Sequence, residues 1–153
     1  MCHEQVKLLL VEDDDGHATL VERNLKRAGM ANPIVHLRNG REALQYVRSE
    51  GPFEKVTHEG GLLMLLDIKM PELDGVQVLE ALKADARTAQ IPIIMLSTTD
   101  DPREVDQCYR LGCSVYITKP VSYEEFVEAV RRLGLFLQVV KLPTLRAGRQ
   151  VSP

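Results

Sequence analysis

The chain has 153 residues, of which 44% are hydrophobic and 27% charged, ordinary values for one soluble globular domain with its own core. The formal net charge of −3 gives no electrostatic reason to expect a nucleic-acid partner. No apolar run approaches the roughly 20 residues that span a bilayer, so we expect no membrane association.

Five short apolar runs alternate with amphipathic stretches along the chain. The first, third and fourth runs are nearly continuous rather than alternating, which is typical of strands covered on both faces in a parallel sheet. The predicted strands are Val6–Val11, Ile34–Leu37, Leu62–Leu66, Ile93–Leu96 and Val115–Ile117.

Each predicted strand is followed by a helix signal. An apolar stripe with helical spacing starts at Ala18 and stops at Gly29, and Gly112 ends a later helix. The expected helix starts are Asn39 with Glu42 (a candidate capping box), Asp74 with Gly75, Asp101 with Pro102, and Ser122 with Glu125. The resulting βαβαβαβαβα order predicts an α/β fold, a (βα)5 doubly wound parallel five-stranded sheet.

The remaining segments add little chemistry. Ser49–Gly61 is polar and is predicted to be a long surface loop. The three cysteines lack metal-site spacing, and Cys108 and Cys113 are expected to be small buried apolar residues. The start of the chain lacks a secretion signal, so we expect a cytoplasmic protein. We expect one domain over residues 1–145 and a flexible tail over residues 146–153.

Charged or hydroxyl residues follow four of the five predicted strands. They are Glu12, Asp13 and Asp14 after the first, Asp67 after the third, Ser97 and Thr98 after the fourth, and Lys119 with Pro120 just after the fifth. In a doubly wound sheet, ligands bind beyond the carboxyl ends of the strands. We therefore expect these side chains to meet at one rim.

Carboxylates gathered at one rim repel one another, by roughly 4 kcal/mol for two charges about 4 Å apart at an effective dielectric of 20. They need a cation or bound protons, and a site made only of oxygens favours Mg²⁺. Lys119 supplies a further positive charge, and Ser97 supplies a hydroxyl donor. With these parts, Asp67 can act as the nucleophile of an in-line phosphoryl transfer that yields a labile aspartyl phosphate.

Each part also has a purely structural reading. An acidic triplet after a strand can serve only as a helix N-cap, a Lys-Pro step can be only a turn, and Ser-Thr after a strand is common. Their joint occurrence at four strand ends, in this order, favours a site.

These motifs resemble the receiver domain of bacterial two-component response regulators, over about Val6 to Val140. The matching segments are Leu-Leu-Val-Glu-Asp-Asp at 9–14, Leu-Asp-Ile-Lys-Met-Pro-Glu-Leu-Asp-Gly at 66–75, Pro-Ile-Ile-Met-Leu-Ser-Thr at 92–98 and Tyr-Ile-Thr-Lys-Pro at 116–120. The resemblance implies a flavodoxin-like sheet of strand order 2-1-3-4-5. It also implies a phosphorelay protein that takes a phosphoryl group from a sensor histidine kinase and slowly loses it, and that is not an enzyme with a separate substrate.

The resemblance further implies roles for individual residues. Asp67 would be the phosphoacceptor, assisted by Lys119. Mg²⁺ would be held by Asp67, by Asp13 directly, by Glu12 through water and by the backbone carbonyl of Lys69. Ser97 and Tyr116 would form a switch pair that changes the face of the fourth helix, fifth strand and fifth helix. The Lys119–Pro120 peptide is expected to be cis. Thr98 stands where the family usually has a smaller residue, which would narrow access to Asp67.

The end of the chain predicts partners. Together with the loop at Ser49–Gly61, the segment Leu133–Pro143 resembles single-domain regulators paired with phytochrome-type histidine kinases. Apolar residues of the last helix exceed one core-facing stripe; the surplus comprises Leu135, Phe136, Val139, Val140 and Leu142. We expect a homodimer through this helix and the segment after it. The alternative is a helix end covered by its own tail.

Three other readings remain. A hydrolase with an aspartyl nucleophile would resemble Asp-x-Asp, whereas Asp67 is followed by Ile68 and Lys69. A degenerate receiver would be an interaction module that is never phosphorylated. A DNA-binding regulator is disfavoured because too few residues follow Val140 for a helix-turn-helix domain, so we expect none.

Overall fold

A computed structural model of the chain describes residues 6–119 and 122–137. Its strands are β1 (Lys7–Val11), β2 (Ile34–Leu37), β3 (Leu62–Asp67), β4 (Ile93–Ser97) and β5 (Val115–Thr118). Its helices are α1 (Asp15–Arg27), α2 (Gly40–Arg48), η1 (Gly51–Phe53, a 3₁₀-helix), α3 (Gly75–Ala84), α4 (Pro102–Leu111) and α5 (Tyr123–Leu137). The strands form one parallel sheet in the order β2-β1-β3-β4-β5, so the predicted fold and strand order are confirmed.

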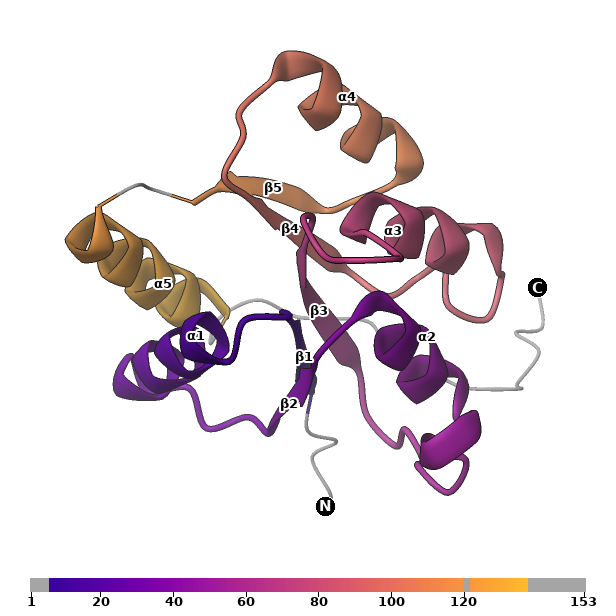
Figure 1. Cartoon of the computed structure of the whole chain (residues 1–153). Coiled ribbons are helices and arrows are strands. Elements are labelled where there is room, and N and C mark those ends of the chain that lie inside the picture. Colours follow the sequence, from indigo (N-terminus) through magenta and orange to yellow (C-terminus); the bar gives the residue numbers. More distant parts are fainter. Residues whose placement is uncertain (1–5, 120–121, 138–153) are drawn as a thin grey trace.

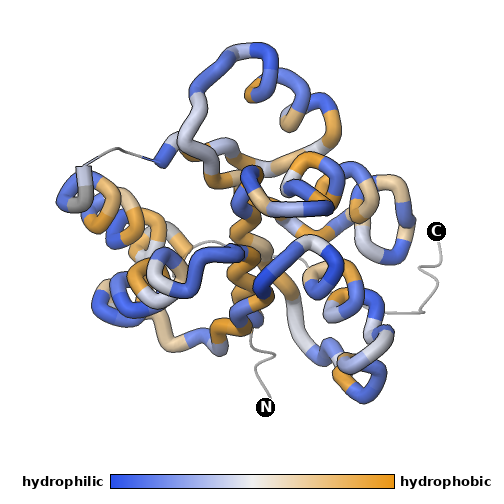
Figure 2. Tube along the Cα trace, in the orientation of Figure 1, coloured by the Kyte–Doolittle hydropathy of each residue, from blue (hydrophilic) through white to orange (hydrophobic). Residues whose placement is uncertain are grey.

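The sheet separates two apolar cores. Figure 1 shows α1 and α5 on one side of the sheet and α2 and α3 on the other. Leu8 and Leu10 of β1 pack with α1 and α5, while Leu9 and Val11 pack with α2 and α3. Because successive side chains of a strand point to opposite faces, β1, β3 and β4 are apolar at nearly every position (Figure 2). The apolar runs of the sequence are the buried centre of this sheet.

Most of the predicted helix ends are confirmed. Asp74 and Gln77 form a complete capping box at the start of α3, and α4 ends at Gly112, whose φ of 108° favours glycine. Asn39 caps α2 by accepting from the Glu42 amide. The predicted capping box of α2 is only half right, because the Glu42 carboxylate accepts from the amide of Arg38 rather than that of Asn39.

The loop between α2 and β3 has more structure than its polar composition predicted. It contains the 3₁₀-helix η1, whose Phe53 packs edge-on against Tyr46 with ring centroids 5.3 Å apart. The Nε2 of His58 donates to the Tyr46 carbonyl over 3.0 Å. One aromatic contact and one hydrogen bond, both to Tyr46 of α2, therefore fasten the loop to the domain.

The expectation for the two cysteines is confirmed, whereas the expectations for the end of the chain fall on residues that the structure does not describe. Cys108 and Cys113 are buried and free, as predicted, and both belong to the core on the α2 and α3 side. No helix in the described part of the chain is long and apolar enough to cross a membrane. The predicted tail at 146–153 and the apolar residues Val139, Val140 and Leu142 lie outside the described residues.

Candidate functional site

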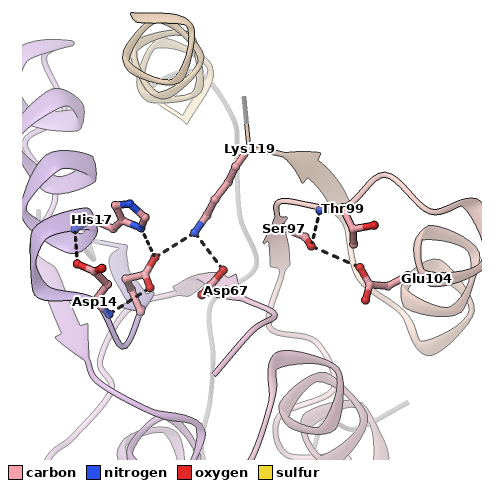
Figure 3. A network of polar contacts seen from close by, with 8 residues as sticks. Asp14, His17, Asp67, Ser97, Thr99, Glu104 and Lys119 are labelled. Atoms are coloured by element: carbon pink, nitrogen blue, oxygen red, sulfur yellow. Dashed lines mark hydrogen bonds and ion pairs between the residues drawn. The ribbon is translucent and has the colours of Figure 1, made fainter. Parts of the chain in front are cut away.

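Charged side chains from separate segments meet beyond the carboxyl ends of the strands. One carboxylate oxygen from each of Glu12, Asp13 and Asp67 lies within 4.8 Å of the other two. The Nζ of Lys119 reaches into this cluster and donates to Glu12 Oε1 over 3.1 Å and to Asp67 Oδ1 over 3.0 Å (Figure 3). The sequence prediction that these four residues share one rim is confirmed.

Strand register explains why they meet. Val11 of β1 pairs with Leu66 of β3, so the next residues, Glu12 and Asp67, emerge side by side. On the other side of β3, the carbonyl of Ser97 at the end of β4 accepts from the backbone amide of Lys119 over 2.6 Å. Backbone pairing thus places Glu12 beside Asp67, and the long Lys119 side chain extends from the end of β5 to reach both.

Burial sets the electrostatics of the cluster. Glu12 is 4% and Asp67 is 7% exposed, whereas Asp13 is open to solvent. Burial raises the pKa of the Glu12 carboxyl above its ordinary value; Lys119 offsets part of this rise and the Asp67 charge adds to it. Burial alone would lower the pKa of the Lys119 ammonium, but Asp67 and Glu12 raise it overall. Lys119 therefore stays charged and compensates the buried carboxylates.

The acidic triplet divides into two roles. Asp14 is the N-cap of α1, and its Oδ1 accepts from the His17 amide over 3.1 Å. The Asp14 amide in turn donates to Glu12 Oε2 over 3.2 Å. The N-cap reading of the triplet therefore holds for Asp14, while Glu12 and Asp13 belong to the carboxylate cluster.

Two histidines that sequence reasoning did not assign lie against Glu12. His36 of β2 has Nε2 2.7 Å from the Glu12 carbonyl, and Nδ1 of His17 lies 4.0 Å from Glu12 Oε1. His36 holds the backbone at the rim, and the half-exposed His17 points toward the carboxylate cluster (Figure 3). The position of His36 at the end of β2 was the available signal, because it lies at the same rim as the acids.

Ser97 and Tyr116 join a second polar group beside the cluster. Ser97 is 1% exposed, and its hydroxyl lies 3.4 Å from Glu104 Oε2. The Tyr116 hydroxyl lies 2.7 Å from the same Glu104 oxygen and 2.8 Å from the Thr99 carbonyl. Glu104, in the first turn of α4, was not identified from the sequence. Glu104 lies one turn after the Asp101 cap, and this spacing alone does not predict that its side chain points toward β4 and β5.

The donor set fits a hard divalent cation. Three carboxylates are ligands that Mg²⁺ and Mn²⁺ take, and the buried Glu12 and Asp67 are held in position by Lys119. The ligand roles of Glu12, Asp13, Asp67 and the Lys69 carbonyl stay predictions. Thr98 is exposed at the rim, and the peptide to Pro120 lies outside the described residues.

A protein-family model described as the response regulator receiver domain matches residues 8–131. Response regulator Rcp1 of Synechocystis sp. (strain PCC 6803) is 30% identical over 137 residues, which are 89% of this chain and 92% of Rcp1.

Solved structures of response regulators also resemble this chain. A response regulator receiver domain from Rhodospirillum rubrum is 41% identical with a TM-score of 0.85, covering 92% of this chain and 99% of its own. The phosphorylated cyanobacterial phytochrome response regulator RcpA is 31% identical with a TM-score of 0.82, covering 91% and 99%. The Mn²⁺-bound form of a response regulator named Rcp1 is 28% identical with a TM-score of 0.81, covering 90% and 98%.

Proposed function

The chain belongs to the response regulator receiver domain family, and from this premise we propose that Asp67 accepts a phosphoryl group from a sensor histidine kinase. One observation carries the proposal: Lys119 bridges Asp67 and Glu12 inside a cluster of three carboxylates at the sheet rim. A structural ion pair alone would not need a third, solvent-exposed carboxylate beside it. The arrangement suits a nucleophile that meets a phosphoryl donor at an open edge.

In the proposed step, a carboxylate oxygen of Asp67 attacks phosphorus on the phosphohistidine of the kinase. A P–O bond forms, the P–N bond breaks, and its electron pair returns to the imidazole nitrogen. The Lys119 ammonium neutralises charge on the phosphoryl oxygens, and the Ser97 hydroxyl donates a hydrogen bond to one of them. Hydrolysis of the aspartyl phosphate later returns the carboxylate, so the protein modifies only itself.

Glu12, Asp13, Asp67 and the Lys69 carbonyl would hold Mg²⁺. When bound, the cation supplies positive charge that offsets the phosphoryl oxygens. The similar regulator Rcp1 has a Mn²⁺-bound form, which supports a divalent cation as a ligand of this chain. Around it, Asp14 and His36 keep Glu12 oriented through its carboxylate and its carbonyl.

The proposed output is a change in the face formed by α4, β5 and α5. Ser97 and Tyr116 connect the site to that face, because Tyr116 lies on β5 and its hydroxyl contacts Glu104 of α4. Phosphorylation can shift this face only through contacts that differ between the two states. The likeness to RcpA, a phytochrome response regulator, supports a phytochrome-type kinase as partner. We propose that the two proteins meet in the cytoplasm.

A homodimer through α5 is also proposed. Leu135 is 46% exposed, while Leu133 and Leu137 on the same helix pack against the core with α1. Sedimentation at micromolar concentration tests it, with Leu135→Glu expected to shift the mass toward the monomer. A wild-type monomer with and without phosphorylation would contradict the dimer and favour a helix covered by its own tail.

Intact-mass measurement tests the phosphoacceptor proposal. Incubation with acetyl phosphate and Mg²⁺ should add one phosphoryl group to the wild-type chain and none after chelation with EDTA. Asp67→Asn should stay unmodified, whereas Asp15→Asn, which changes an exposed carboxylate beside the rim, should behave as wild type. A folded wild-type protein that is never modified would identify a degenerate receiver instead.

A further inference from the structure

Glu104 carries a contact pattern that the proposed phosphoryl transfer does not require. Its Oε2 lies 2.7 Å from the Tyr116 hydroxyl and 3.4 Å from the Ser97 hydroxyl. Figure 3 shows Glu104 and Ser97 directed toward each other from α4 and the end of β4. One carboxylate oxygen therefore faces both hydroxyls through which the site is proposed to act.

The contact between Ser97 and Glu104 matters because the Ser97 hydroxyl has a single proton to donate. A hydroxyl has one proton to donate, so Ser97 cannot donate to Glu104 and to a phosphoryl oxygen at the same time. The Thr99 amide, 3.2 Å from Ser97 Oγ, donates to the same hydroxyl and occupies one of its two acceptor positions, which leaves its single proton free for only one of these acceptors. Ser97 must leave Glu104 before it can bind the phosphorylated form of Asp67.

The same carboxylate holds the tyrosine. Tyr116 has two acceptors within reach, the Glu104 carboxylate and the Thr99 carbonyl, and the charged acceptor gives the stronger bond. Burial raises the pKa of Tyr116 to about 12; a hydrogen bond with Ser97 acts against this rise, while the hydrogen bond to Glu104 and its charge add to it. The phenol therefore keeps its proton and stays a donor.

Helix α4 buries little of its surface, although Leu111 at its end also packs against the core. Cys108 is its one buried residue. The Tyr109 hydroxyl accepts from the Tyr116 backbone amide over 3.1 Å, so Tyr116 ties β5 to α4 by its amide and by its side chain. Because Glu104 lies in the first turn of α4, a change of its hydrogen-bond partner directly changes how that turn is held against β5.

Building on the phosphoacceptor function proposed above, we propose that Glu104 is a positioning residue that competes with the phosphoryl group of Asp67 for the Ser97 proton. In the unphosphorylated protein it holds the Ser97 and Tyr116 hydroxyls and keeps the first turn of α4 against β5. Phosphorylation takes Ser97 away from Glu104, and Tyr116 is left as its remaining hydroxyl donor. Glu104 thereby sets how much phosphoryl donor is needed to fill the site.

Glu104→Gln tests the inference, because it keeps the shape and removes the charge. The acetyl phosphate concentration that half-phosphorylates the protein should fall about tenfold, the ratio expected for one lost charge-assisted hydrogen bond. Asp106→Asn, which neutralises an exposed carboxylate on the same helix, should leave this concentration unchanged. An unchanged midpoint in Glu104→Gln would overturn the inference while leaving the phosphoacceptor role intact; no phosphorylation of the wild type would instead contradict that role.

Two further measurements separate a Ser97-mediated effect from simple charge removal. On a Ser97→Ala background, Glu104→Gln should no longer shift the midpoint, because the competed hydroxyl is gone. A shift of the same size on both backgrounds would overturn the inference. Ultraviolet titration, with Tyr116→Phe to identify the signal, should show a lower Tyr116 pKa in Glu104→Gln; an unaltered pKa would contradict the contact itself.

Discussion

The ammonium nitrogen of Lys119 lies 3.0 Å from Oδ1 of Asp67, and the two residues are 52 positions apart in the chain. Each side chain is 9% exposed, so this is a nearly buried ion pair rather than a surface one. Removing one partner of such a pair leaves a charge without compensation in a poorly solvated place. Lys119 therefore contributes both to the stability of the rim and to its chemistry.

Lys119→Met should lower the free energy of unfolding by about 3 kcal/mol or more in the absence of divalent cation, because Glu12 and Asp67 then repel each other unopposed. Added Mg²⁺ should restore part of this loss, and phosphorylation by acetyl phosphate should be strongly reduced. Urea denaturation with and without Mg²⁺ measures the first effect. Lys26→Met, which removes an exposed lysine paired with Glu22, should change stability by less than about 1 kcal/mol. Equal losses in the two variants would contradict the assigned role of Lys119.

Gly75→Ala should disturb the phosphoacceptor strand. A Cβ at Gly75 would collide with the Asp67 carbonyl oxygen and lie 2.8 Å from the Ile68 Cα, both rigid backbone atoms. We expect a loss of about 1–3 kcal/mol in unfolding free energy and slower phosphorylation, since the Asp67 backbone must move. At Gly16, a Cβ would meet a side-chain oxygen of Asp14 at 3.2 Å, so Gly16→Ala is the milder control. A fully stable, fully active Gly75→Ala would show that this close approach is absent in solution.

Lys83 has a structural role away from the rim. Its Nζ donates to the carbonyls of Ala89 and Ile91, each over 2.7 Å, and burial lowers its pKa. Lys83→Met should lower the free energy of unfolding by about 2 kcal/mol, because the two carbonyls lose their hydrogen-bond donor. Thermal or urea unfolding measures this, with the exposed Lys55→Met as control. The phosphorylation midpoint should not move, and a stability equal to that of the control would refute the assignment.

His58 should make stability depend on pH. Burial lowers its pKa below the ordinary value of 6.5, so the unfolded chain binds the proton more readily than the folded one. The contribution of neutral His58 to the free energy of unfolding is therefore fully present above about pH 6.5 and is lost as the pH falls below that value. His58→Gln retains a donor for the Tyr46 carbonyl and cannot be protonated, so its stability should fall less between about pH 7 and pH 5 than that of the wild type. Identical pH profiles would exclude His58 as a contributor.

Local patterns in the sequence predicted the fold because each depends on near neighbours. Continuous apolar runs located the buried strands, and caps such as Asp74 located helix starts within a residue. The rim cluster followed from topology alone, since parallel strands bring Glu12, Asp67 and Lys119 to one edge.

Contacts between elements could not be predicted in this way. Glu104 faces Ser97 and Tyr116 because of how α4 packs over β5, and helical periodicity gives no information about that packing angle. The same holds for His58, whose contact with the carbonyl of Tyr46 depends on a loop of irregular backbone. Sequence reasoning thus reached the residues that carry the proposed chemistry, and missed those that restrain them.

Borohydride trapping tests the central claim most directly, because it reduces an acyl phosphate to an alcohol and marks the residue that carried it. After incubation with acetyl phosphate and Mg²⁺, reduction and peptide mass mapping should find homoserine at position 67 and at no other aspartate. Homoserine at position 13, or no trapped residue in a folded protein that has gained a phosphoryl group, would contradict the assignment of Asp67 as the phosphoacceptor.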